Sequence, residues 1–133
     1  MSAHSYGFGV ETDLDPAQAE AKMREALAEE GFGILTEIDV AAVLKSKLDV
    51  DVDPYRILGA CNPQLAHKAL SSEQSIGLLL PCNVIIYEKG QGSVIEVLEP
   101  KLMAELTANP DLEEIADDAR ARLERALARV GAG

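Results

Sequence analysis

The chain has 133 residues, with 12 Lys and Arg against 23 Asp and Glu, so its formal net charge at pH 7 is −11. Such a charge repels the phosphate backbone of nucleic acids and anionic membrane surfaces, so we expect no nucleic acid and no membrane as partner. The length fits one domain over 1–133 with one hydrophobic core. Trp is absent and aromatic residues make up 4%, so Leu, Ile, Val and Ala must form most of that core.

The sequence predicts a cytoplasmic protein with free thiols. No stretch approaches the roughly 18 consecutive apolar residues that a membrane span needs. Residues 1–15 lack the basic region and apolar run of a secretory signal. In a chain that is not secreted, Cys61 and Cys82 are expected to be free thiols instead of a disulfide framework.

A strand and then a helix are predicted at the start of the chain. Tyr6, Phe8 and Val10 alternate along 5–12 and favour a strand with these side chains on one face. Asp15 is a good N-cap, and Pro16 suits the first helical position. The apolar stripe of this helix consists of Ala19, Met23, Ala26 and Leu27.

Two further strand–helix pairs are predicted. The first strand covers 32–38 and is followed by a short helix capped by Asp39. The second strand covers 55–60 and is followed by a helix over 64–70, capped by Asn62. We expect the first of these strands to place four side chains on one side: Phe32, Ile34, Thr36 and Ile38.

The second half of the chain predicts a hairpin and a long helix. Strands over 83–89 and 93–98 flank Gly90-Gln91-Gly92, where glycine supplies the positive φ that a short loop needs. A short helical turn follows and ends near Thr107, and the last helix begins at Asn109-Pro110. The fold class is therefore mixed α+β: a layered domain with a small twisted sheet of about five strands, a hairpin and a long C-terminal helix.

The middle third of the chain resembles a known family. Residues 55–70 read YRILGACNPQLAHKAL and residues 76–88 read IGLLLPCNVIIYE. The paired blocks LGACNP and LLPCNV resemble those of the domain of unknown function 302 family. The resemblance implies a compact α/β domain that tends to dimerise, and it brings no catalytic residue or substrate. The acidic connector 49–54 departs from the family pattern, so the role of that segment stays open.

The two cysteines are the main candidates for chemistry. Cys61 precedes a helix start, where unpaired N–H groups would stabilise a thiolate and lower its pKa. The favoured interpretation is a small buried side chain that closes a strand. Two Cys–Asn pairs, at Cys61 and Cys82, could face each other as a redox pair or as part of a metal site. Without a C-x-x-C spacing, two independent thiols are favoured.

A metal site is not predicted. Cys61, Cys82, His67 and His4 could supply four zinc ligands, but their spacing fits no finger or ribbon, and we expect an exposed His67 and a disordered His4. Three aspartates, Asp49, Asp51 and Asp53, have the spacing that opens a calcium loop. The required Gly and bidentate Glu are missing, so this segment is interpreted as a solvated acidic turn or as an edge strand protected by charge.

The remaining candidate residues suggest binding. Tyr55 and Arg56 open a strand and could line a pocket for an anionic ligand near a helix N-terminus. Asn62 and Asn83 are expected to cap a helix and to shape a turn. Tyr87 is expected in the core. No dinucleotide, Walker, nucleophile-elbow or zincin motif is present, so the sequence identifies no cofactor.

Three hypotheses remain open. The favoured one is a homodimer that binds a small molecule or a partner. The alternative is a thiol-based redox, sulfur-transfer or soft-metal-binding protein that uses Cys61 and Cys82. A hydrolytic or transfer enzyme based on carboxylates ranks last, because no acidic pair has a spacing that sets it apart from a solvated face.

Overall fold

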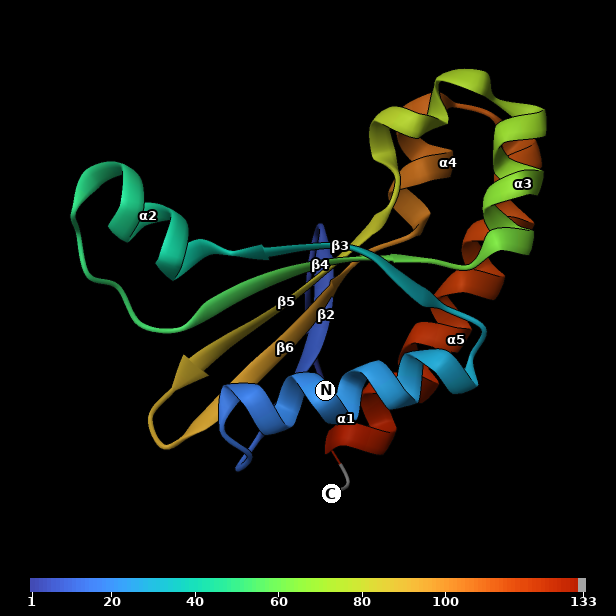
Figure 1. Ribbon diagram of the computed structural model, residues 1–133. Helices are drawn as coiled ribbons and strands as arrows, with labels where there is room; N and C mark the ends of the chain where they lie inside the picture. Colours follow the sequence, from blue (N-terminus) through green and yellow to red (C-terminus); the bar gives the residue numbers. More distant parts are fainter. Residues whose placement is uncertain (132–133) are drawn as a thin grey trace.

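A six-stranded antiparallel sheet forms the centre of the computed structural model, which describes residues 1–131 (Figure 1). The strand order is β1-β2-β6-β5-β4-β3. The strands are β1 Ser2–His4, β2 Gly7–Thr12, β3 Gly33–Asp39, β4 Tyr55–Cys61, β5 Cys82–Lys89 and β6 Gly92–Leu98. The α-helices are α1 Pro16–Glu29, α2 Val40–Leu48, α3 Pro63–Ser72, α4 Lys101–Thr107 and α5 Glu113–Gly131, with 3-10 helices η1 Gln74–Leu79 and η2 Pro110–Leu112. The expected α+β class is confirmed.

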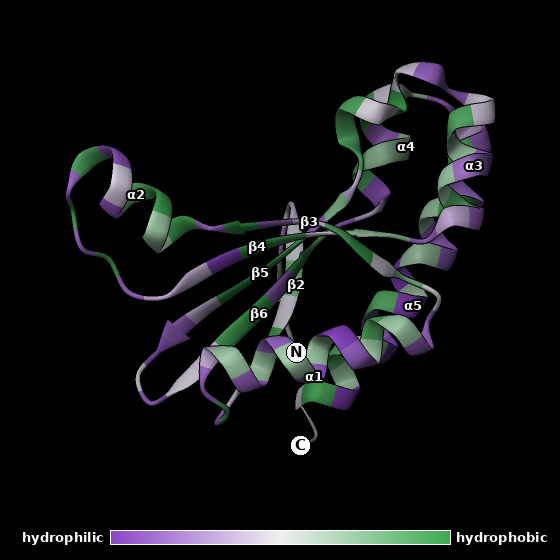
Figure 2. Cartoon of the chain, in the orientation of Figure 1, coloured by the Kyte–Doolittle hydropathy of each residue, from purple (hydrophilic) through white to green (hydrophobic). Residues whose placement is uncertain are grey.

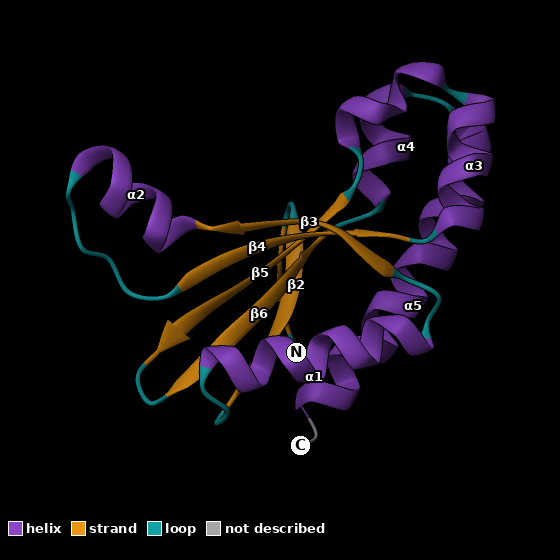
Figure 3. Cartoon of the chain, in the orientation of Figure 1, coloured by secondary structure: helices purple, strands orange, loops and turns teal. Residues whose placement is uncertain are grey.

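The helices are distributed unevenly around the sheet. Figure 3 shows α1 and α5 against one face, with α2 at one end of the strands and α3 and α4 at the other. The main core lies between the sheet and the pair α1–α5, where the apolar sides of these elements meet (Figure 2). Its fully buried large side chains include Phe8, Met23, Leu27, Leu58, Ile86, Ile95, Leu123 and Leu127. We call the opposite side of the sheet the open face.

A second, smaller core lies beyond the end of the sheet. Ala69, Ile76, Met103, Leu112 and Ala116 pack together there, from α3, η1, α4, η2 and α5. These elements form a lobe that extends from the sheet (Figure 1).

The predicted helix starts are confirmed. The Asp15 carboxylate accepts a hydrogen bond from the Gln18 amide at 2.8 Å, and Asn62 Oδ1 accepts one from the Leu65 amide at 3.2 Å. In both cases a proline occupies the start of the helix, where its missing N–H costs nothing. Neighbouring residues alone determine these starts.

Helices α1 and α5 are connected through Glu30, the residue that directly follows α1. Its buried carboxylate accepts from Arg125 Nε at 3.0 Å and pairs with Arg129 Nη2 at 3.1 Å. Its carbonyl oxygen accepts from Arg122 Nη1 at 2.9 Å. Three arginines of α5 therefore hold the C-terminal end of α1.

A bulge in β3 makes one prediction wrong. The pairing of β3 with β4 shifts between Ile34 and Thr36, so the side-chain alternation is interrupted there. Ile34 packs against the main core, whereas Ile38 is 45% exposed. Thr36 and Ile38 therefore do not share a face with Ile34. The extra residue of a bulge cannot be recognised from alternation alone.

The N-terminus also differs from the prediction. The expected strand over 5–12 begins only at Gly7, because residues 5–6 form a tight turn to the additional strand β1. This strand makes the sheet six-stranded, where about five strands were expected. His4, expected to be disordered, lies in β1, with Nε2 2.7 Å from Glu96 Oε1.

The end of the chain follows the prediction more closely. The segment expected as one helix from Asn109 consists of η2 followed by α5. Among residues 1–131, no helix combines the length and apolar character needed to cross a bilayer.

Candidate functional site

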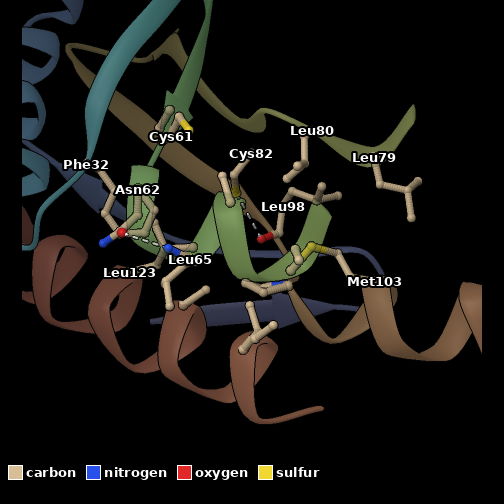
Figure 4. A pocket seen from close by; sticks show the side chains of 16 residues that line it. Phe32, Cys61, Asn62, Leu65, Leu79, Leu80, Cys82, Leu98, Met103 and Leu123 are labelled. Atoms are coloured by element: carbon tan, nitrogen blue, oxygen red, sulfur yellow. Dashed lines mark hydrogen bonds between the residues drawn. The ribbon is translucent and has the colours of Figure 1, made fainter. Parts of the chain in front are cut away.

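Three of the candidate residues meet in one small pocket at the end of the sheet. Cys61, Asn62 and Cys82 line it where β4 passes into α3 and β5 begins (Figure 4). Its cavity volume is about 50 Å³. The other walls are apolar side chains of the sheet end, α3, η1, α4 and α5, among them Phe32, Leu65, Leu79, Leu80, Leu98, Met103, Ile115 and Leu123. We call this space the thiol pocket.

Cys82 is a protonated thiol in the wall of the thiol pocket. Its Sγ donates to the carbonyl oxygen of Leu98 at 3.8 Å. Burial raises the pKa of Cys82 to about 12. Because the thiolate is the nucleophilic form, Cys82 is a poor nucleophile at neutral pH.

Cys61 closes β4, as the sequence predicted, but its side chain is half-buried where a buried one was expected. Ala60 pairs with Cys82 across the β4–β5 ladder, so the two cysteines lie on neighbouring strands. Both thiols are free. In Figure 4 the sulfur of Cys82 points toward Leu98, whereas the sulfur of Cys61 does not. Both cysteines therefore line the same pocket, but they form no disulfide.

Asn62 supports the backbone around the pocket. It is 8% exposed, and its Oδ1 caps α3. Its Nδ2 donates to the carbonyl oxygen of Glu30 at 3.3 Å. The predicted capping role is therefore confirmed, and the amide also connects α3 to the end of α1.

Arg56 and Tyr55 lie on opposite faces of β4, because successive side chains of a strand alternate. Arg56 Nε donates to Glu20 Oε1 at 2.8 Å on the helix-covered face. Burial acts to raise the pKa of Glu20, but hydrogen bonds from Arg56 and Arg24 outweigh it and lower the pKa. The guanidinium of Arg56 is thus engaged within the fold, apart from Tyr55.

Tyr55 and Asn83 line a depression on the open face. Asn83 lies within β5, so the expectation that it shapes a turn is wrong. The Tyr55 and Tyr87 rings are stacked, with centroids 5.6 Å apart and an 8° angle between planes. Burial raises the pKa of Tyr55, and the nearby Glu96 carboxylate adds to this shift. We call this space the tyrosine depression; its lining also includes His4, Tyr6, Gly7, Ile85, Glu96, Val97 and Leu98.

Sequence reasoning missed most of the tyrosine depression. Tyr87 was expected in the core, but its side chain faces away from the main core and lines the depression. Alternation along β5 and β6 places Tyr87 and Glu96 on the same face as Tyr55. The alternation can be seen in the sequence, but it identifies a shared face only when the order of the strands is known.

The candidate metal ligands lie in different parts of the structure, since Cys61 and Cys82 line the thiol pocket whereas His4 lies in β1. Within 1–131, no group of three or more His, Cys, Asp or Glu side chains could hold a metal ion. His67 is exposed on α3 and is not part of the thiol pocket. Asp49 and Asp51 are exposed and pair with Lys45 at 2.9 and 3.3 Å, as expected for a solvated acidic turn.

Comparison with known proteins identifies a family and a related solved structure. The family described as Domain of unknown function DUF302 matches residues 8–130. The chain is similar to an uncharacterized conserved protein, DUF302, from Bacillus stearothermophilus, whose crystal structure shares 30% sequence identity and a TM-score of 0.87. That match covers 95% of this chain and 98% of the other. No curated protein matches the chain. The chain therefore belongs to the DUF302 family.

Proposed function

We propose that this chain is a cytoplasmic, homodimeric binding protein that takes a small apolar ligand in the thiol pocket. The observation that carries this proposal is the convergence of Cys61, Asn62 and Cys82 in one cavity with apolar walls. Free cysteines support the cytoplasmic location, because reducing compartments keep thiols unpaired.

The pocket restricts the size and polarity of its ligand. Its volume of about 50 Å³ is well below the roughly 300–1,000 Å³ of sites for drug-sized molecules. The amide of Asn62 is already bonded to Leu65 and Glu30, so it offers little to a polar ligand. A ligand of a few apolar atoms fits these properties.

Xenon is a suitable probe for the ligand site, since it enters small apolar cavities. We expect xenon to shift the methyl resonance of Met103, which lines the pocket. Ala66→Leu should abolish the shift by filling the pocket from α3, whereas Ala121→Leu, at an exposed position of α5, should preserve it. A Met103 methyl that does not respond to xenon in the wild-type protein contradicts the proposal.

The proposed dimer interface lies on the segment from β3 to the connector after α2. Six of the exposed large apolar side chains gather there: Leu35, Ile38, Val43, Leu48, Val50 and Val52. β3 is the last strand of the sheet, so within residues 1–131 its outer edge has no partner strand. An exposed edge strand can pair with its own copy about a two-fold axis, and apolar side chains on both copies then become buried. A second copy of this chain is therefore the occupant we propose.

Oligomeric state tests this interface directly. Light scattering after size exclusion should give twice the chain mass for the wild type and a monomer for Leu35→Lys. Leu106→Lys is the matched control, since Leu35 and Leu106 are 66% and 67% exposed and only Leu35 lies on β3. A wild-type monomer at micromolar concentration contradicts the proposal.

The thiol-based function is the second candidate, because both cysteines line one pocket. The high pKa of Cys82 makes Cys61 the attacking thiol in any exchange. Oxidised glutathione would form a mixed disulfide with Cys61 and release one reduced glutathione. Cys82, whose thiol is protonated and bonded to the carbonyl oxygen of Leu98, would stay reduced. Mass spectrometry of the native protein tests this step, and a chain without a mixed disulfide at Cys61 excludes it.

A further inference from the structure

The tyrosine depression gathers an unusual share of the aromatic residues. The chain contains three Tyr and no Trp, and Tyr6, Tyr55 and Tyr87 all line this one space. They come from the β1–β2 turn, β4 and β5, which are far apart in sequence. Tyr55 and Tyr87 stack as an aromatic wall, and Tyr6 packs against His4 with ring centroids 4.2 Å apart.

A carboxylate lines the same depression as these rings. Glu96 is on β6, directly opposite Ile85 of β5, and its side chain is 22% exposed. Its Oε1 accepts from His4 Nε2 at 2.7 Å, and in the described part of the chain Oε2 has no hydrogen-bond partner. The Glu96 carboxylate therefore keeps one oxygen for a ligand.

Two glycines of β2, Gly7 and Gly9, let the side chains of His4 and Glu96 lie close to the sheet. A Cβ at Gly9 would stand 2.7 Å from Glu96 Cγ, and a Cβ at Gly7 would stand 3.0 Å from His4 Cε1. Both distances are shorter than ordinary carbon contacts of about 3.5–4.0 Å. The missing side chains thus leave room for His4 and Glu96 above β2.

The charge of the depression selects the class of ligand. Its lining contains Glu96 and no Lys or Arg. The whole chain carries a net charge of −11, so anions are repelled before they reach the site. Aromatic faces attract cations through the ring quadrupole, and quaternary ammonium groups are recognised in this way.

We propose that the tyrosine depression binds a small organic cation, with a quaternary ammonium group held by the tyrosine rings and the Glu96 carboxylate. This site lies on the open face of the sheet, whereas the thiol pocket lies at the end of the sheet, and Leu98 borders both. The ligand of the tyrosine depression is chosen by charge and not by apolar character.

Choline and its neutral analogue 3,3-dimethylbutanol form a matched pair of probes, because they differ mainly in the charged nitrogen. Since the chain has no Trp, intrinsic emission comes from the three tyrosines of the depression. We expect choline, at constant ionic strength, to change this emission with a millimolar Kd, and the alcohol to bind at least several-fold more weakly. No response to choline, or an equal response to the alcohol, would overturn the proposal.

Two pairs of variants separate the local interactions from the net charge. Glu96→Gln should weaken choline binding roughly 5- to 10-fold, about the effect of one nearby charge near a protein surface. Glu88→Gln removes the same charge from an exposed residue outside the depression and should leave the Kd unchanged. Tyr87→Phe should keep binding, and Tyr87→Leu should weaken it. Equal losses in Glu96→Gln and Glu88→Gln would overturn the proposal.

Discussion

Gly9→Ala should destabilise the protein strongly, although it adds a single methyl group. The new Cβ would overlap the carbonyl oxygen of Ile95 and lie 2.7 Å from Glu96 Cγ and 2.9 Å from Glu96 Cα. The carbonyl oxygen and the Cα belong to the backbone of β6, which pairs with β2 on one side and β5 on the other. These backbone atoms cannot move away without disturbing the hydrogen bonds of both the β2–β6 and the β5–β6 ladders.

The magnitude of this effect follows from two opposing contributions. Overpacking of this kind costs typically about 1–3 kcal/mol, and the rigid neighbours place Gly9→Ala at the upper end. Replacing Gly by Ala also restricts the unfolded chain, which stabilises by roughly 0.4–1 kcal/mol. The net loss is about 2 kcal/mol, which corresponds to a fall in Tm of roughly 6–10 °C for a chain of this size.

Gly33→Ala is the matched control, because Gly33 also lies in a strand but its Cβ would meet no atom within 4 Å. It should leave the free energy of unfolding unchanged or raise it by up to about 1 kcal/mol. Urea unfolding followed by circular dichroism, at one protein concentration, measures both variants. A Gly9→Ala variant within about 0.5 kcal/mol of the wild type would refute the packing argument.

Three further predictions concern the core and the titrating groups. Leu127→Ala should lower the free energy of unfolding by about 2–5 kcal/mol in urea titrations, because Leu127 is fully buried between α5 and the sheet; a loss below about 1 kcal/mol would contradict this. The hydrogen bond from Arg125 lowers the pKa of Glu30 below its ordinary value of 4.5. This stabilisation is present above pH 4.5 and is lost as the pH falls through the pKa of the folded state. The free energy of unfolding of Glu30→Gln should therefore fall less steeply at acidic pH than that of the wild type. An unchanged pH dependence would argue against the arginine contacts. Iodoacetamide at pH 8 should modify Cys82 only after unfolding, given its pKa of about 12, and peptide-resolved mass spectrometry of the native protein checks this.

The parts of the fold that depend on neighbouring residues could be predicted from the sequence. Asp15 and Asn62 begin helices because a cap and a proline stand side by side. Gly90 has φ 60° in the hairpin turn, as the loop spacing required.

The candidate site depends on contacts that no local pattern contains. The pairing of Ala60 with Cys82 brings the two cysteines into one pocket, and the sequence left their distance open. Tyr6 and Tyr55 line the same depression only because the strands between them follow the order β1-β2-β6-β5-β4. Chain crossovers determine this order, and alternation of apolar residues carries no information about it.

The strand order also has a consequence for biosynthesis. β2 pairs with β1, which directly precedes it, but its other ladder partner β6 is synthesised much later, and the arginines that bind Glu30 after α1 lie in α5. While 113–131 are still in the exit tunnel, the face of the sheet that carries Phe8 and Ile95 has no cover from α5. The main core is therefore completed only after α5 has left the tunnel, and a helix synthesised late in the domain covers a strand synthesised early.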